Sequence, residues 1–141
     1  ILYDRYHSRL LYYYGGLVHM MPVYAALLLI FTMANIALPG TSSFVGEFLL
    51  LLGIYKTNVI SAIVGALGVI LCGAYSLWLY NRIIFGNLKT SFIVRFKDIN
   101  FLEFSILLPL LFFVIFMGVY PSFFSNFIHL SVCNLSLVTM Y

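Results

Sequence analysis

Residues Ala37 to Gly53 read ALPGTSSFVGEFLLLLG and are the most informative segment of the sequence. It contains two features that an ordinary membrane helix lacks. Pro39 and Gly40 interrupt an apolar region, and a proline inside a helix removes a backbone donor and clashes with the preceding turn. Further along comes Glu47, an acid that is followed by a phenylalanine and four leucines. The sequence therefore places a single acid close to a predicted helix break.

The composition predicts an integral membrane protein. Of the 141 residues, 64% are hydrophobic and 8% are charged, and the mean hydropathy is +1.10. Soluble domains carry about 25% charged residues, so this chain has too few charges to cover a globular surface. The formal net charge of +3 is also too small for a nucleic-acid-binding face. We therefore expect lipid, and no nucleic acid, around this chain.

The first residues of the sequence indicate that it is one part of a longer or split protein. The sequence begins on the apolar residues Ile1, Leu2 and Tyr3 rather than on Met, as the tail of a preceding helix would. The basic, apolar and small-residue regions of a cleavable signal do not follow one another here. We expect either a split gene product or a part of a longer chain.

Long uncharged stretches predict the membrane spans, because about 20 apolar residues cross the hydrocarbon core. Three spans are expected, at residues 22–55, 59–81 and 104–120. Around them we predict the end of a preceding helix with a loop (1–21), a second loop (82–103) and an amphipathic C-terminal helix (121–141). The polar or small residues of this tail recur at helical spacing; they are Ser122, Ser125, Asn126, His129, Cys133 and Ser136. A fourth short crossing is the alternative interpretation of the tail.

The first span is too long for one straight helix. Residues 22–55 would extend roughly 50 Å as a helix, whereas the hydrocarbon core is about 30 Å thick. We therefore predict two half-helices that are joined at Pro39–Gly40, with Thr41, Ser42 and Ser43 capping the second half. Such a link is tolerated in a membrane only where protein or water surrounds it.

The basic residues predict the orientation. Six of the seven Lys and Arg lie before the first span or between the second and third spans, and only Lys56 lies between the first and second. With three crossings, the two regions that hold the six share one side, which the positive-inside rule assigns to the matrix or cytoplasm. The C-terminus is then expected on the opposite side.

The second span carries a stripe of small residues that suits helix packing. The stripe follows offsets of three and four and consists of Ser61, Gly65, Gly68, Cys72 and Ser76. Cys72 and Cys133 are both expected to be small buried apolar residues. Because the sequence has no CxxC, Cys/His cluster, GxxxxGK[ST] or GxGxxG after a strand, we expect this chain to bind no metal and no cofactor.

Glu47 is the main candidate for chemistry. An acid near the bilayer centre costs about 2.5–3.5 kcal/mol on insertion scales, so Glu47 should face the protein interior or water. Burial favours its protonated form, whereas the N-terminus of the second half-helix favours the carboxylate. A group balanced in this way can load and release a proton. The alternative is a structural acid pinned to a Lys or Arg of another helix, and no basic residue of this chain lies at membrane depth.

The histidines are weaker candidates. His19 lies at the entry to the first span and could pass protons to water, although an interfacial histidine without a function is the alternative. A haem held between His19 and His129 is excluded, because the predicted topology puts them on opposite sides.

The remaining charges are expected to be structural or solvated. Glu103 lies at the start of the third span, where the helix dipole favours an acid, and we expect a structural role for it. Solvated loop charges are expected at four positions, which are Asp4, Arg5, Lys97 and Asp98.

Five segments carry a resemblance to a known family. They are LYDRYHSR (2–9), YYGGL (13–17), MANIALPGTSSFVGEFLLLLG (33–53), AYSLWLYNRIIFGNL (74–88) and MGVYPSFF (117–124). In order and spacing they closely resemble the C-terminal third of the chain 4 family of mitochondrial NADH–ubiquinone oxidoreductase, and especially its plant and protist members. The resemblance covers essentially the whole chain. The parent superfamily also contains subunits of multisubunit sodium/proton antiporters and of membrane-bound hydrogenases.

For the fold, the resemblance implies an all-α membrane protein that is part of a fourteen-helix antiporter-like bundle. This chain would supply the end of the eleventh helix and the twelfth to fourteenth, of which the twelfth is discontinuous in the family. Glu47 matches the family's proton-carrying acid near the exit to the intermembrane space, where the related chains 2 and 5 carry lysine. The family's other channel residues, including a central lysine, would precede residue 1. We therefore expect that this chain alone is not catalytic and that a second polypeptide or a longer chain supplies them.

For the function, the resemblance implies a non-redox subunit of proton-pumping respiratory complex I in the mitochondrial inner membrane, with its C-terminus towards the intermembrane space. NADH, FMN, iron–sulfur clusters and ubiquinone are expected in other subunits. The expected partners are other membrane-arm subunits, including neighbouring antiporter-like chains. Two alternatives stay open: a structural membrane subunit without a proton path, and a subunit of a multisubunit cation/proton antiporter.

Overall fold

The computed structural model describes residues 1–88 and 97–139, and within these ranges the chain is helical without strands. The predicted all-α class is therefore confirmed for the described residues. The elements are α1 (Leu2–Tyr6), two short 3₁₀ turns η1 (Leu11–Tyr13) and η2 (Leu17–His19), α2 (Pro22–Asn35), α3 (Ser42–Thr57), α4 (Val59–Ile84), α5 (Phe101–Val119) and α6 (Pro121–Thr139). Lys89 and Arg95, which support the predicted orientation, lie outside the described residues, as does the side chain of Ser136.

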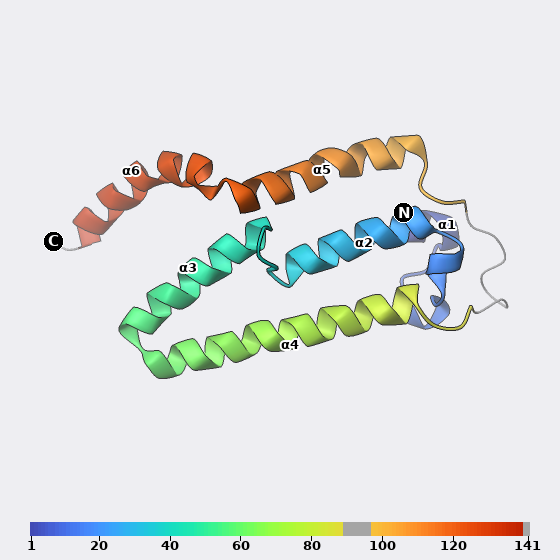
Figure 1. Cartoon of the computed structure of the whole chain (residues 1–141), viewed down its shortest axis with the longest axis horizontal. Coiled ribbons are helices and arrows are strands. Elements are labelled where there is room, and N and C mark those ends of the chain that lie inside the picture. The colour runs from blue at the N-terminus through green and yellow to red at the C-terminus, as the bar shows by residue number, and fades with distance from the viewer. Residues whose placement is uncertain (89–96, 140–141) are drawn as a thin grey trace.

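The broken helix lies between two flanking helices. α2 and α3 follow one another with a non-helical link between Asn35 and Ser42, where the sequence predicts the break. α5 runs along one side of α2 and α3, and α4 returns along the other side (Figure 1). Among the described helices, α4 and α5 are long and apolar enough to cross a membrane, and α2 is a shorter apolar helix. The predicted number of three crossings stays a prediction.

A single residue, Asn58, joins α3 to α4. Its side-chain oxygen accepts hydrogen bonds from the backbone N–H groups of Ile60 and Ser61, at 3.0 and 3.4 Å. This N-cap satisfies donors that a helix start otherwise leaves unpaired. The tight turn brings α4 back beside α3, and the two helices contact each other.

The buried core lies at the end of the molecule where the segment around η2, the start of α2 and the end of α4 meet (Figure 1). Six buried side chains form it, namely Tyr14, Leu17, Ala25, Tyr80, Ile83 and Ile84. The Tyr80 hydroxyl also donates to the Ala25 carbonyl oxygen at 3.3 Å. Packing within the chain is therefore concentrated at this end, and most of the large apolar side chains of α4 and α5 are exposed.

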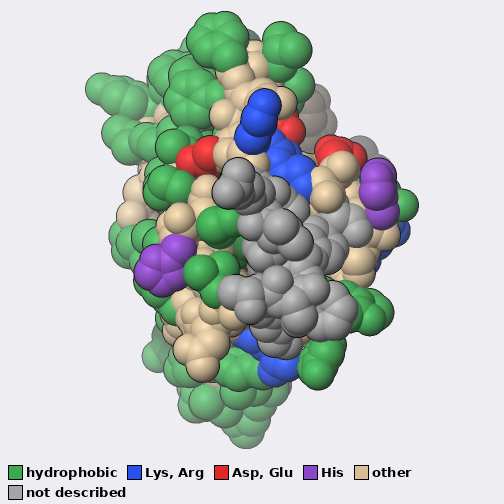
Figure 2. Space-filling model, turned by 90° about the vertical axis from the view of Figure 1, so that its right-hand side faces the viewer, with side chains coloured by type: hydrophobic (Ala, Val, Ile, Leu, Met, Phe, Trp, Pro, Cys, Tyr) green, Lys and Arg blue, Asp and Glu red, His purple; other side chains and the backbone are tan. Residues whose placement is uncertain are grey.

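Three charged residues form a clamp at the same end, and the prediction that Arg5 and Asp98 are solvated is wrong. Arg5 pairs with Glu103 through Nη1···Oε1 at 3.0 Å and Nη2···Oε2 at 2.9 Å. The remaining guanidinium N–H groups donate to the carbonyl oxygens of Ile1, Lys97 and Asp98. Figure 2 shows charged side chains of both signs gathered at this end. We call Arg5, Asp98 and Glu103 the charged clamp.

Two residues of the charged clamp also accept hydrogen bonds from backbone N–H groups at the N-termini of α2 and α5. Met21 precedes α2 and has no polar side chain, so the α2 N-terminus is capped from elsewhere. Asp98 accepts from the N–H groups of Val23 at 3.0 Å and Tyr24 at 3.3 Å. Glu103 accepts from the Asn100 N–H at 2.8 Å, which closes the first turn of α5. The structural role predicted for Glu103 is thus confirmed. The hydrogen bonds to Glu103 raise the pKa of Arg5 above the usual range of an arginine, so the guanidinium stays charged at any working pH.

The outward faces of α4 and α6 hold the two cysteines. Cys72 and Cys133 are both exposed on this chain, so the prediction that they are buried is wrong within the part that the structure describes. Both lie on helix faces that no other described helix covers. α6 begins at Pro121 after a single non-helical residue, and its described side chains are mostly exposed. Its predicted place at the membrane interface stays a prediction.

Candidate functional site

The link between α2 and α3 begins with a standard helix ending. The Leu38 N–H donates to the Met33 carbonyl at 3.2 Å, and the Ala37 N–H donates to the Ala34 carbonyl at 3.1 Å. Ala37 has φ 59°, in the left-handed region. These two bonds around a left-handed residue form a Schellman motif, in which glycine is the usual residue. The helix therefore ends before Pro39, and the proline follows its cap.

A tight turn completes the link. The Thr41 N–H donates to the Leu38 carbonyl at 3.0 Å, with Pro39 and Gly40 in the two central positions. Gly40 has φ 95°. Proline followed by a residue of positive φ is typical of a type II turn. The link thus consists of two consecutive turns with internal hydrogen bonds, which lowers the energetic penalty of irregular backbone in a membrane.

The prediction that Thr41 caps α3 is wrong in one respect. Thr41 occupies the N-cap position, but its side chain makes no capping bond. Its hydroxyl donates instead to the Leu38 carbonyl at 2.8 Å, because the turn brings that oxygen within reach. Ser42 and Ser43 are the first two residues of α3 and are half-buried. The side chain at the predicted cap therefore reinforces the turn and leaves the first N–H groups of α3 without that partner.

Glu47 lies in the second turn of α3 and is half-buried. The helix dipole acts mainly within the first turn of a helix, and Glu47 lies beyond the first turn of α3. The rings of Phe44 and Phe48 stack beside Glu47, with centroids 5.6 Å apart. Both rings line one cavity together with Glu47.

A small cavity adjoins Glu47. It has a volume of about 110 Å³ and is lined by α3, by the link and by α4, through Ala37, Phe44, Glu47, Phe48, Leu51 and Val69. Glu47 is the one acidic residue in this lining. The volume is sufficient for water, which needs on the order of 10–15 Å³ in such a measure. Glu47, Ala37 of the link and Val69 of α4 therefore border the same cavity.

The Glu47 carboxylate has neither a hydrogen bond nor an ion pair with any residue in the described ranges. A structural acid in a membrane protein normally pairs with a basic side chain. Lys56, the next basic residue along the chain, is exposed at the far end of α3. No fixed partner within residues 1–88 and 97–139 therefore accounts for this acid.

The structure does not bring all predicted proton-path residues to Glu47. His19 is exposed in η2, at the opposite end of α2 from the link. Ser42 lines a different and larger groove of about 620 Å³ between α3, α5 and α6, together with Ser122 and Ser125. Thr41 and Ser43 lie close to Glu47 along the chain, but neither lines its cavity.

The small-residue stripe predicted on α4 coincides only partly with the face that packs inside the chain. Gly65 is half-buried against Leu51, and Ser76 is buried. The other three residues, Ser61, Gly68 and Cys72, are exposed, so a packing role for them stays a prediction. The contact face of α4 runs beside the stripe and consists of Ala62, Gly65, Val69, Gly73, Ser76 and Tyr80.

Two glycines that touch the link were not singled out by sequence reasoning. A side chain at Gly73 of α4 would lie 3.3 Å from the Cγ2 methyl of Ile36, and one at Gly118 of α5 would overlap the Gly40 carbonyl group. Glycine inside an apolar helix is a signal of close backbone approach, but the sequence does not say to what.

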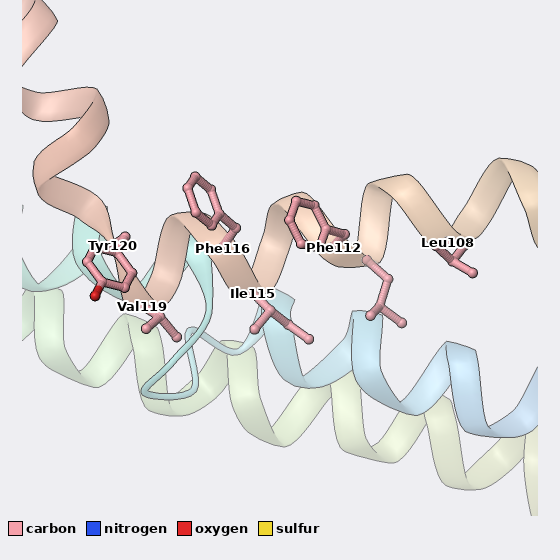
Figure 3. A pocket seen from close by; sticks show the side chains of 7 residues that line it. Leu108, Phe112, Ile115, Phe116, Val119 and Tyr120 are labelled. Atoms are coloured by element: carbon pink, nitrogen blue, oxygen red, sulfur yellow. The ribbon is translucent and has the colours of Figure 1, made fainter.

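A third hollow runs along α5 and is lined only by residues 108–120 (Figure 3). Its volume is about 410 Å³, and the hydroxyl of Tyr120 is its main polar group. It offers no constellation for chemistry. Among the described residues, no group of three His, Cys, Asp or Glu side chains could hold a metal ion. The predicted absence of bound cofactors stays a prediction.

Comparisons with known proteins agree on one family. Residues 1–73 match the family model described as NADH:quinone oxidoreductase/Mrp antiporter, TM. NADH-ubiquinone oxidoreductase chain 4 of Marchantia polymorpha is 54% identical over 134 residues, which cover 95% of this chain and 27% of that protein. NADH-quinone oxidoreductase subunit M of Rhodobacter capsulatus is 47% identical over 135 residues, covering 96% of this chain and 26% of that protein.

A solved structure resembles the fold. A chain of respiratory complex I from Thermus thermophilus with bound NADH superimposes with a TM-score of 0.81 at 35% identity, over 88% of this chain and 26% of that one. The present chain thus spans about a quarter of the length of the curated relatives that it matches.

Proposed function

This chain belongs to the NADH:quinone oxidoreductase/Mrp antiporter membrane family, and from that premise we propose that it is a membrane-arm subunit of proton-pumping NADH:ubiquinone oxidoreductase. It takes part in proton translocation that is coupled to NADH oxidation and quinone reduction in other subunits. The relatives of known name support this proposal, because several are chain 4 or subunit M of that enzyme. The chain itself carries no redox step.

The observation that carries the proposal is the state of Glu47. It is a half-buried acid beside a helix break, it borders a cavity with room for water, and no described residue pairs with it. A carboxylate without a fixed partner can take up and release a proton at small reorganisation cost. We assign Glu47 the role of proton carrier, exchanging protons with a basic group outside this chain and with water.

The rest of the path is proposed from the sequence. We place His19 at the charged end, where it exchanges protons with water, and Thr41, Ser42 and Ser43 on the path beside the link, outside the lining of the Glu47 cavity. The chain lies in the mitochondrial inner membrane within a fourteen-helix bundle, with three crossings and its C-terminus towards the intermembrane space. Neighbouring antiporter-like chains, and a polypeptide region that carries the upstream channel residues, are its partners, and NADH, FMN, iron–sulfur clusters and ubiquinone are held by other subunits.

The test is the substitution Glu47→Gln in the assembled complex, which keeps the shape of the side chain and removes its titration. We expect NADH:quinone turnover and the coupled proton movement to fall at least about tenfold, since a positioned acid contributes roughly 10²–10⁴-fold to proton transfer. Asp4→Asn is the matched control, because the Asp4 side chain is 73% exposed and lies far from the link along the chain.

Both quantities are measured per assembled complex, in vesicles with a pH-sensitive dye. Full turnover and full pumping in the Glu47→Gln variant would refute the proposal and favour a structural subunit. Purifying the complex and identifying its polypeptides separates an oxidoreductase from an antiporter outside that enzyme.

A further inference from the structure

The link between α2 and α3 passes between two glycines that belong to the two flanking helices. Gly73 of α4 faces Ile36 at the start of the link, and Gly118 of α5 faces Gly40 and Thr41 at its end. α4 and α5 lie on opposite sides of the broken helix (Figure 1). The break is therefore held from two sides at two successive positions.

The two contacts differ in kind. At Gly118, an added Cβ atom would overlap the carbonyl group of Gly40 and lie 2.6 Å from the carbonyl carbon of Thr41, and both are backbone groups that cannot rotate away. At Gly73, an added Cβ atom would lie 3.3 Å from a side-chain methyl of Ile36, which can move by a few tenths of an ångström.

The link in turn forms part of the surroundings of Glu47. Ala37, the left-handed residue of the link, lines the Glu47 cavity, and so does Val69, which lies one turn before Gly73 on α4. A displacement of the link or of α4 therefore changes the walls of this cavity. Because packed interiors respond to added volume by shifts of backbone and side chains, the position of Glu47 relative to its surroundings depends on both glycines.

We propose that Gly73 and Gly118 are positioning residues for the proton carrier: their missing side chains let α4 and α5 close on the helix break and fix the cavity beside Glu47. The inference rests on the proposed function of Glu47 and adds how the site is held. It also gives α5, which supplies no residue to the Glu47 cavity, a role in the geometry of that cavity.

The test is a graded series of Gly→Ala substitutions in the assembled complex. Gly53→Ala on α3 is the control, since nothing lies within 4 Å of an added Cβ atom there and alanine favours a helix over glycine. A misplacement of about 1 Å can lower a rate by up to roughly 10²-fold. We expect turnover per assembled complex to be unchanged in Gly53→Ala, about two- to threefold lower in Gly73→Ala and about tenfold lower in Gly118→Ala.

A spectroscopic reading separates positioning from general destabilisation. The infrared C=O stretching band of Glu47 is identified as the band that Glu47→Gln removes, and it should shift in Gly73→Ala and Gly118→Ala but not in Gly53→Ala. If Gly118→Ala does not assemble, the milder Gly73→Ala variant decides. Turnover equal to the control, or lowered turnover with an unshifted band, would overturn the inference. The proposed function fails separately, through full activity of Glu47→Gln.

Discussion

The charged clamp should contribute measurably to the free energy of unfolding, and the contacts of Arg5 set the expected size of this contribution. Arg5 uses all five guanidinium N–H groups, two of them on the Glu103 carboxylate. The two side chains are 14% and 23% exposed. Removing one member of a buried ion pair costs about 3–5 kcal/mol, and partial exposure reduces this through solvent screening. We therefore expect Arg5→Ala to lower the free energy of unfolding by about 2–3 kcal/mol.

A double-mutant cycle isolates the ion pair from the backbone contacts of Arg5. Glu103→Gln should cost about 1–2 kcal/mol, since the amide oxygen still accepts from the guanidinium, and the coupling energy between the two positions should be about 1–2 kcal/mol. Arg9→Ala is the matched control. Arg9 is exposed, with its guanidinium 5.0 Å from the centroid of the Tyr3 ring, so its loss should cost less than about 1 kcal/mol.

The assay is unfolding of the purified chain in mild detergent by added sodium dodecyl sulfate. The transition is followed by circular dichroism and by the fluorescence of Trp78, the single tryptophan of the sequence. The effects of independent sites add to within about 0.5 kcal/mol, so a coupling energy below this value would contradict a stabilising Arg5–Glu103 pair. An equal loss of unfolding free energy in Arg5→Ala and Arg9→Ala would contradict it as well.

Two further predictions concern helix ends and use the same unfolding assay. Ala37→Gly should raise the free energy of unfolding by about 0.5–1 kcal/mol, because the left-handed φ of 59° penalises alanine by about 1–2 kcal/mol and glycine's extra unfolded-state entropy offsets part of the gain; a destabilised variant would contradict the assigned turn. Asp98→Ala should lower the free energy of unfolding by about 1 kcal/mol through loss of the α2 cap, whereas Asp98→Asn should be close to neutral. Equal losses of unfolding free energy in both variants would indicate that the charge of Asp98, rather than its capping hydrogen bonds, stabilises the chain.

Local signals accounted for the elements of this chain but not for their contacts. Pro39, Gly40 and the residues after them predict a break because proline and glycine act on the backbone within a few residues. Pro109 shows the limit of this reasoning, since it lies inside α5 without ending the helix. The difference lies in the neighbours. Pro39 follows a completed helix cap and precedes a glycine in a turn, whereas Pro109 has leucines on both sides.

Hydropathy, helix breakers and isolated charges act over short distances, so the helical membrane class, the position of the break and the acid beside it could be predicted from the sequence. The residues that surround the break and the acid follow from the packing of the helices. The clamp joins Arg5 to Glu103, and Gly118 meets Gly40 across most of the chain. Such pairs form only when the helices pack, so no spacing in the sequence encodes them. For the same reason the sequence predicts that Glu47 lies in a membrane, whereas the cavity beside it, which α3, the link and α4 line, is seen only in the structure.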